Sequence, residues 1–96
     1  RDLIIAATQS PSPRIKMLAY QSLRLILGAE AHPYFEEGIK DLSPEVRAEV
    51  VKEASWLPSN RGKAVVLLGL EDPNSEVNRS ALQVVHRLGL ETFESE

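Results

Sequence analysis

Hydrophobic positions recur along the chain with a period of 31 residues, and the copies align without a gap. Four aligned columns are Ile15, Val46 and Val77; Ala19, Val50 and Ala81; Leu23, Ala54 and Val85; and Ile26, Leu57 and Leu88. A repeat of this length is typical of a stacked solenoid and not of a fold with one closed core. The sequence therefore predicts one domain over 1–90, built from three copies at about 1–30, 31–60 and 61–90, followed by an acidic tail at 91–96.

Each copy contains two apolar segments with helical spacing, separated by a polar turn. The stripes of the first segments are Leu3, Ile4, Ala6 and Ala7; Tyr34, Phe35, Gly38 and Ile39; and Val65, Val66, Gly69 and Leu70. The turns contain Ser12-Pro13, Ser43-Pro44 and Asn74-Ser75. Ser or Asn caps a helix start, and Pro is tolerated at the first helical position. We predict second helices at 13–27, 44–57 and 75–88, and an all-α fold: an α-solenoid of three stacked antiparallel helix pairs with no strand.

Two features of the columns predict the packing between units. Val50 and Leu57 fall on the apolar side of the middle second helix, so we expect both to be buried between stacked units. Ala7, Gly38 and Gly69 share a column that lacks side-chain bulk. We interpret this column as a place where two helices approach closely.

The composition limits the classes of partner and chemistry. The chain has 11 Lys plus Arg against 14 Asp plus Glu, a net charge of -3, so we expect neither nucleic acid nor an anionic membrane as a partner. No apolar run approaches the roughly 20 residues of a membrane span. The absence of cysteine fits a reducing compartment, although it also fits exported proteins; we expect the cytoplasm. Because the chain starts at Arg1, we expect a piece of a larger polypeptide.

The turn and second helix of the later copies carry a family resemblance. The stretch from Asp41 to Arg47, and the stretch from Asp72 to Val77, are each followed by apolar residues at helical spacing. These stretches resemble HEAT repeats of the short bacterial kind, over residues 1 to 90. The resemblance implies that Asp41, Arg47 and Asp72 form hydrogen bonds between units. The flanking copies differ from the pattern, with Ser10 and Lys16 in the first and Asn78 in the third.

The resemblance also implies that the second helices line a concave groove. On the helical wheel, Trp56 falls away from the buried side, and Leu25 and Arg87 occupy its column in the other copies. With Lys52 and Arg24 nearby, these residues form our candidate binding site for an acidic or polar segment of a protein partner. The alternative is that Trp56 folds over the turn at Pro58 and packs on its own neighbours.

The first helices point to a second surface. The middle copy has Glu36 and Glu37 where the third copy has Leu67 and Leu68. Apolar outer residues on an end unit need a cover, so we expect Leu67 and Leu68 to lie in a contact between copies of the chain or under another segment.

Catalytic relatives of HEAT arrays provide the remaining alternatives. Diiron hydroxylases of this type carry His-Glu pairs, whereas His32 and His86 stand in different elements without such a partner, so we expect no metal and no cofactor. The Gly-Lys at 62–63 lacks the other residues of a phosphate loop. A DNA glycosylase needs a basic face, and the exposed side of the second helices carries four cations and two anions, namely Arg24, Lys52, Arg79, Arg87, Glu49 and Glu53. The repeat spacing alone does not distinguish this chain from HEAT-like lyases.

We therefore predict a non-catalytic protein-binding or regulatory scaffold. A structural spacer or self-association module is the second hypothesis, and a HEAT-like enzyme of the glycosylase or lyase type is the third.

Overall fold

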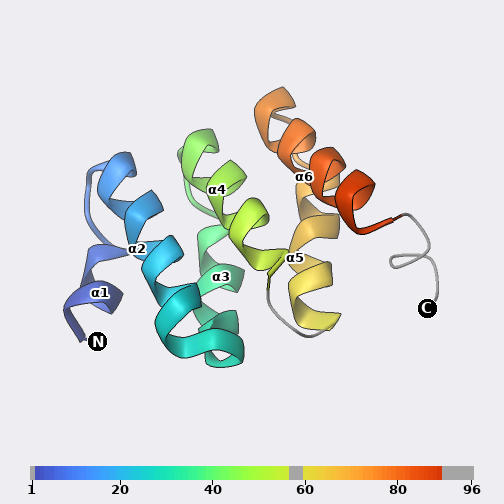
Figure 1. The fold of residues 1–96 in the computed structure, drawn as a ribbon. Coiled ribbons are helices and arrows are strands. Elements are labelled where there is room, and N and C mark those ends of the chain that lie inside the picture. The colour runs from blue at the N-terminus through green and yellow to red at the C-terminus, as the bar shows by residue number, and fades with distance from the viewer. Residues whose placement is uncertain (1, 57–59, 90–96) are drawn as a thin grey trace.

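The computed structural model describes residues 2–56 and 60–89, which form six α-helices in three successive pairs (Figure 1). The pairs are α1 (Asp2–Ala7) with α2 (Pro13–Leu27), α3 (His32–Gly38) with α4 (Pro44–Ala54), and α5 (Asn60–Leu70) with α6 (Ser75–Leu88). A short 3-10 helix, η1 (Gly28–Ala31), joins the first two pairs. No strand occurs in these two ranges. The predicted all-α solenoid is confirmed.

The helices form two layers (Figure 1). The second helices α2, α4 and α6 lie side by side in one layer, and the first helices α1, α3 and α5 form the other. In its own layer α4 packs against both α2 and α6, and it also contacts α3 and α5. The middle second helix therefore has a neighbour on each side in its layer, α2 on one side and α6 on the other.

The starts of the second helices agree with the capping residues in the sequence. Ser12 accepts a hydrogen bond from the N–H of Ile15, and the side chain of Asn74 accepts from the N–H groups of Glu76 and Val77. Ser43 has the same extended backbone at the start of α4, but its side chain makes no capping bond. The side chains of Ser12 and Asn74 thus stabilise the starts of α2 and α6, because they satisfy backbone donors that no helical carbonyl can reach.

The end of α4 differs from the prediction. The helix stops at Ala54, three residues before the predicted end at 57. The hydroxyl of Ser55 donates to the carbonyl of Lys52, and the N–H of Trp56 donates to the carbonyl of Glu53, which is one residue nearer than an α-helix requires. This local turn replaces the last α-helical turn and places Trp56 at the edge of the array.

The core lies between the two layers. Its largest fully buried side chains are Phe35, Leu23, Val46, Val50, Val51, Val65, Val66 and Val77. The predicted burial of Val50 is therefore confirmed, whereas Leu57 lies outside the described residues. Leu3, on the apolar stripe of the first helix, is 86% exposed. Its helix belongs to the first pair, which has a neighbour on only one side in the described array.

Two glycines allow neighbouring units to approach closely, as the column of small residues predicts. A Cβ atom on Gly38 would lie 2.8 Å from Cζ of Tyr20, and one on Gly69 would lie 2.7 Å from Cγ2 of Val51. Tyr20 and Val51 occupy equivalent positions on successive second helices. Each unit therefore inserts one side chain against the small residue of the next. Burial, helped by the charges of Asp41 and Glu37, raises the pKa of Tyr20 to about 12.

Candidate functional site

A ladder of polar contacts connects the turns of neighbouring units. The ammonium of Lys16 lies 2.7 Å from Oδ2 of Asp41. One unit later, Arg47 Nε donates to Asp72 Oδ2 at 2.8 Å, and Nη2 donates to Oδ1 at 3.2 Å. Arg47 also donates to the backbone carbonyl of Asp41 at 2.7 Å. Lys16 therefore takes the role of the missing arginine, and the ladder extends through both junctions.

The ends of the ladder are neutral. Asn78 donates to the carbonyl of Asp72 at 2.7 Å, as Arg47 does to that of Asp41. Its side chain is neutral, however, and forms no ion pair. Ser10 accepts from the N–H of Ser12, as the carboxylate of Asp41 does from Ser43. Ser10 and Asn78 thus keep the hydrogen bonds of the turn but carry no charge for an ion pair.

The electrostatics of Asp72 are those of a structural ion pair. Burial would raise the pKa of this carboxyl, but the hydrogen bonds from Arg47 and from the N–H of Asn74, together with the Arg47 charge, lower it below its ordinary value. Asp72 is therefore charged at neutral pH, and Arg47 serves the junction between units.

The groove between α2 and α4 is closed by buried polar pairs. Glu49 accepts a hydrogen bond from Gln21 at 2.8 Å, and Glu53 pairs with Arg24. The two glutamates are only 6% and 5% exposed. Their prediction as part of the exposed side was wrong, because the long side chains of α2 reach across and cover them. Burial raises the pKa of Glu53 although the hydrogen bond from Arg24 opposes this effect.

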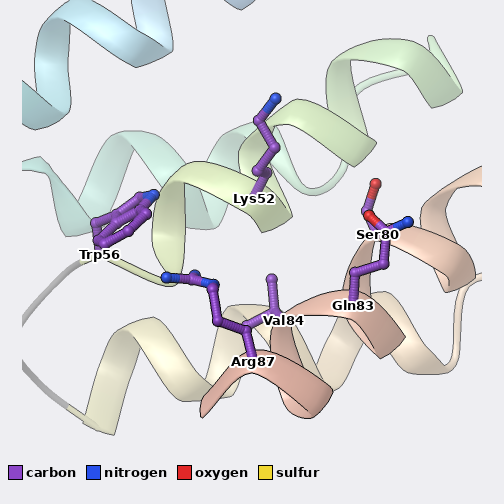
Figure 2. A pocket seen from close by; sticks show the side chains of 6 residues that line it. All are labelled: Lys52, Trp56, Ser80, Gln83, Val84 and Arg87. Carbon is purple, nitrogen blue, oxygen red and sulfur yellow. The ribbon is translucent and has the colours of Figure 1, made fainter.

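The groove between α4 and α6 is open. It contains a pocket of about 310 Å³ lined by Lys52, Trp56, Ser80, Gln83, Val84 and Arg87 (Figure 2). One repeat period after Glu49 and Glu53, the chain has Ser80 and Val84. The smaller side chains leave space where the first groove holds two carboxylates. None of the described residues that line the pocket is acidic.

Trp56 and Arg87 form the wall of this pocket. Figure 2 shows Arg87 extending from α6 toward Trp56 beyond the end of α4, with Val84 pointing from α6 toward α4. The Arg87 guanidinium carbon lies 4.1 Å from the centroid of the indole ring, within cation–π range, and the group also donates to the hydroxyl of Ser55. Trp56 nevertheless remains 55% exposed. The indole is thus held by a neighbouring unit and still presents much of its surface.

A scan against protein-family models matches the HEAT repeats model over residues 1–89. The chain belongs to the HEAT-repeat family. HEAT repeats generally mediate protein–protein interaction or scaffolding. Comparison with curated proteins and with solved structures finds no match.

Two of the five groove residues predicted from the sequence do not line the pocket of the HEAT array. Leu25 is 73% exposed on α2, one unit away from the pocket. The Arg24 guanidinium carbon lies 5.8 Å from the Trp56 ring centroid, but its Nε atom pairs with the buried Glu53. The structure therefore brings Trp56, Arg87 and Lys52 together and assigns Arg24 to the contact between α2 and α4.

The other predicted surface lies on α5. Leu67 and Leu68 are 42% and 51% exposed and border a shallow depression with Ala64 and Glu71. The depression and the α4–α6 pocket have no lining residue in common. The two surfaces predicted from the sequence are thus separate.

Ser80 and Val84 are the pocket residues that the sequence analysis missed. The repeat alignment already distinguished these two positions, because the preceding HEAT unit carries Glu49 and Glu53 there. This difference predicts a pocket only if it is known that the two glutamates face a neighbouring helix. On the helical wheel alone they fall on the exposed side.

Further observations concern membranes and metals. None of the described helices is long and apolar enough to cross a membrane. Within 2–56 and 60–89, no three His, Cys, Asp or Glu side chains gather where they could hold a metal ion. His32 is buried at the start of α3, while His86 is exposed on α6, so the structure keeps the two histidines in different elements.

Proposed function

We propose that this HEAT array is a non-catalytic scaffold that binds a protein partner on the layer formed by its second helices. The observation that carries the proposal is the half-exposed Trp56, stacked with Arg87 above a pocket with an apolar base at Val84. Tryptophan and arginine are the residue types most enriched among those that dominate binding energy. The pocket offers a partner both apolar area and hydrogen-bond donors.

The contacts around Trp56 also favour binding by reducing its entropic cost. Arg87 is fixed by the indole ring and by the Ser55 hydroxyl. A side chain that is already ordered loses less freedom when a partner docks, so more of the contact energy appears as affinity. The same contacts support a non-catalytic role, because the Arg87 guanidinium is already engaged by the indole ring and by the Ser55 hydroxyl.

Replacement of Trp56 with alanine should weaken partner binding by about tenfold or more, because the indole supplies the largest exposed apolar surface of the pocket. The experiment uses the chain as bait in extract of its source, with wild type, Trp56→Ala and Leu67→Glu/Leu68→Glu compared. Binding of each captured protein, once purified, is then measured by calorimetry. A direct partner that binds wild type and the leucine variant but not Trp56→Ala supports the proposal. Equal affinity for Trp56→Ala excludes it.

Self-association is the second candidate function, and the exposed leucines of α5 favour it. Leu67 and Leu68 occupy the positions that carry Glu36 and Glu37 on α3. If copies of the chain associate through α5, Leu67→Glu/Leu68→Glu should shift the sedimentation coefficient toward the monomer while the helical circular dichroism stays unchanged. A wild-type chain that is monomeric at high concentration rules this function out.

A further inference from the structure

We infer that the α4–α6 pocket binds a carboxylate side chain from an acidic, partly apolar segment of the partner protein. The inference rests on the proposed function and names the chemistry of its ligand. It follows from a difference between two grooves that the repeat makes equivalent.

The closed groove serves as an internal template. Between α2 and α4, Gln21 and Arg24 project from one helix and are met by Glu49 and Glu53 from the next. Between α4 and α6, the residues equivalent to the glutamates are Ser80 and Val84. The second groove therefore has a cation, Lys52, in the place of Gln21, neutral Ser55 in the place of Arg24, and no carboxylate opposite them. A carboxylate from another protein can occupy that position.

The charge of the open pocket matches such a ligand. Among the described residues that line the pocket, Lys52 and Arg87 are cations and none is acidic. Lys52 is 61% exposed, and its ammonium lies 3.7 Å from the buried Glu49, so this contact is long and leaves the ammonium open to solvent. Arg87 is held at the rim by Ser55 and Trp56. Arginine binds carboxylates with geometric specificity, and lysine adds attraction without it.

The other residues that line the pocket favour apolar residues on either side of the partner's acidic residue. Trp56 is half exposed, and Val84 lies at the base of the pocket. An acidic residue flanked by apolar residues uses both parts of the pocket. A nucleic acid fits it less well, because duplex binding depends on many phosphate contacts and the pocket offers two cations on a chain of net charge -3.

The test compares two fluorescein-labelled, end-capped peptides, one alternating glutamate and leucine and one alternating glutamine and leucine. Binding to the full chain is measured by fluorescence anisotropy. The glutamate peptide should bind more tightly, and its affinity should fall as salt increases, because the cations are exposed. Equal affinity for the two peptides, or equal or tighter binding of a labelled DNA duplex, overturns the inference.

Ser80→Glu is the decisive variant because it restores the glutamate of the first groove. The added carboxylate should pair with Lys52 and weaken binding of the glutamate peptide by about tenfold. Leu82→Glu is the matched control: it adds the same charge to α6 at an exposed position outside the pocket lining. The control should retain most of the affinity. Circular dichroism melts establish that both variants fold.

The outcomes separate this inference from the proposed function. If a purified partner loses affinity for both Trp56→Ala and Ser80→Glu but not for Leu82→Glu, both stand. If it loses affinity for Trp56→Ala alone, the second-helix layer is the binding surface but the carboxylate inference is wrong. If neither pocket variant affects it, the proposed function is wrong as well.

Discussion

Replacement of Phe35 with alanine should lower the free energy of unfolding by about 3–5 kcal/mol. Phe35 is fully buried on α3, and its ring centroid lies 5.6 Å from that of Tyr20 on α2. The side chain thus joins the first unit to the second. Its removal leaves a cavity between helices that are held apart by their other contacts, so the site cannot readily collapse. Urea unfolding followed by circular dichroism measures the change.

Leu3→Ala provides the control for this prediction. It also removes a large apolar side chain from a first helix, but Leu3 is 86% exposed. Its effect should stay within about 0.5 kcal/mol. If Phe35→Ala and Leu3→Ala destabilise the chain equally, the burial described here for α3 is wrong.

Arg47→Met should destabilise the array by about 2–4 kcal/mol at pH 7. The side chains of Arg47 and Asp72 are only 17% and 9% exposed, and the variant leaves the Asp72 carboxylate without its bidentate partner. Lys16→Met is the matched control at the other junction. It breaks a single bond between more exposed groups, so its cost should be smaller. Urea midpoints of the three proteins measure both effects.

The same variant has a defined pH dependence. The folded-state pKa of Asp72 lies below the ordinary value of 3.8, so the ion pair stabilises the fold above that value. The stabilisation declines as the pH falls through the lowered pKa of the folded state. The difference in stability between wild type and Arg47→Met should therefore be largest at neutral pH and should shrink below about pH 4. A difference that grows in acid would contradict this assignment.

The repeat register predicted those parts of the fold that depend on local sequence. The Ser-Pro and Asn-Ser turns predicted where all three second helices begin, because capping involves residues close in the chain. The column containing Gly38 and Gly69 also predicted close helix contact correctly, since a missing Cβ restricts where another helix can lie. The capping turns and the column of small residues both recur at the same position in successive units, so each pattern is supported more than once by the sequence.

The polar contacts between the second helices were not predicted. Glu49 and Glu53 have the chemistry of surface residues, and only Gln21 and Arg24 on the neighbouring helix make their burial favourable. The open pocket was missed for the same reason, because Ser80 and Val84 become informative only when compared with those glutamates. Trp56 and Arg87 were placed in one column, but their direct contact depends on the turn that ends α4.

We propose that the layer of second helices binds acidic protein segments at the α4–α6 pocket. The most direct test of this proposal is chemical-shift mapping of the isotope-labelled chain during titration with the glutamate–leucine peptide. The account predicts that the largest shifts affect the indole N–H of Trp56 and the backbone amides of Lys52, Gln83 and Arg87. The largest shifts on α1, α3 and α5, with the Trp56 indole unchanged, would contradict it.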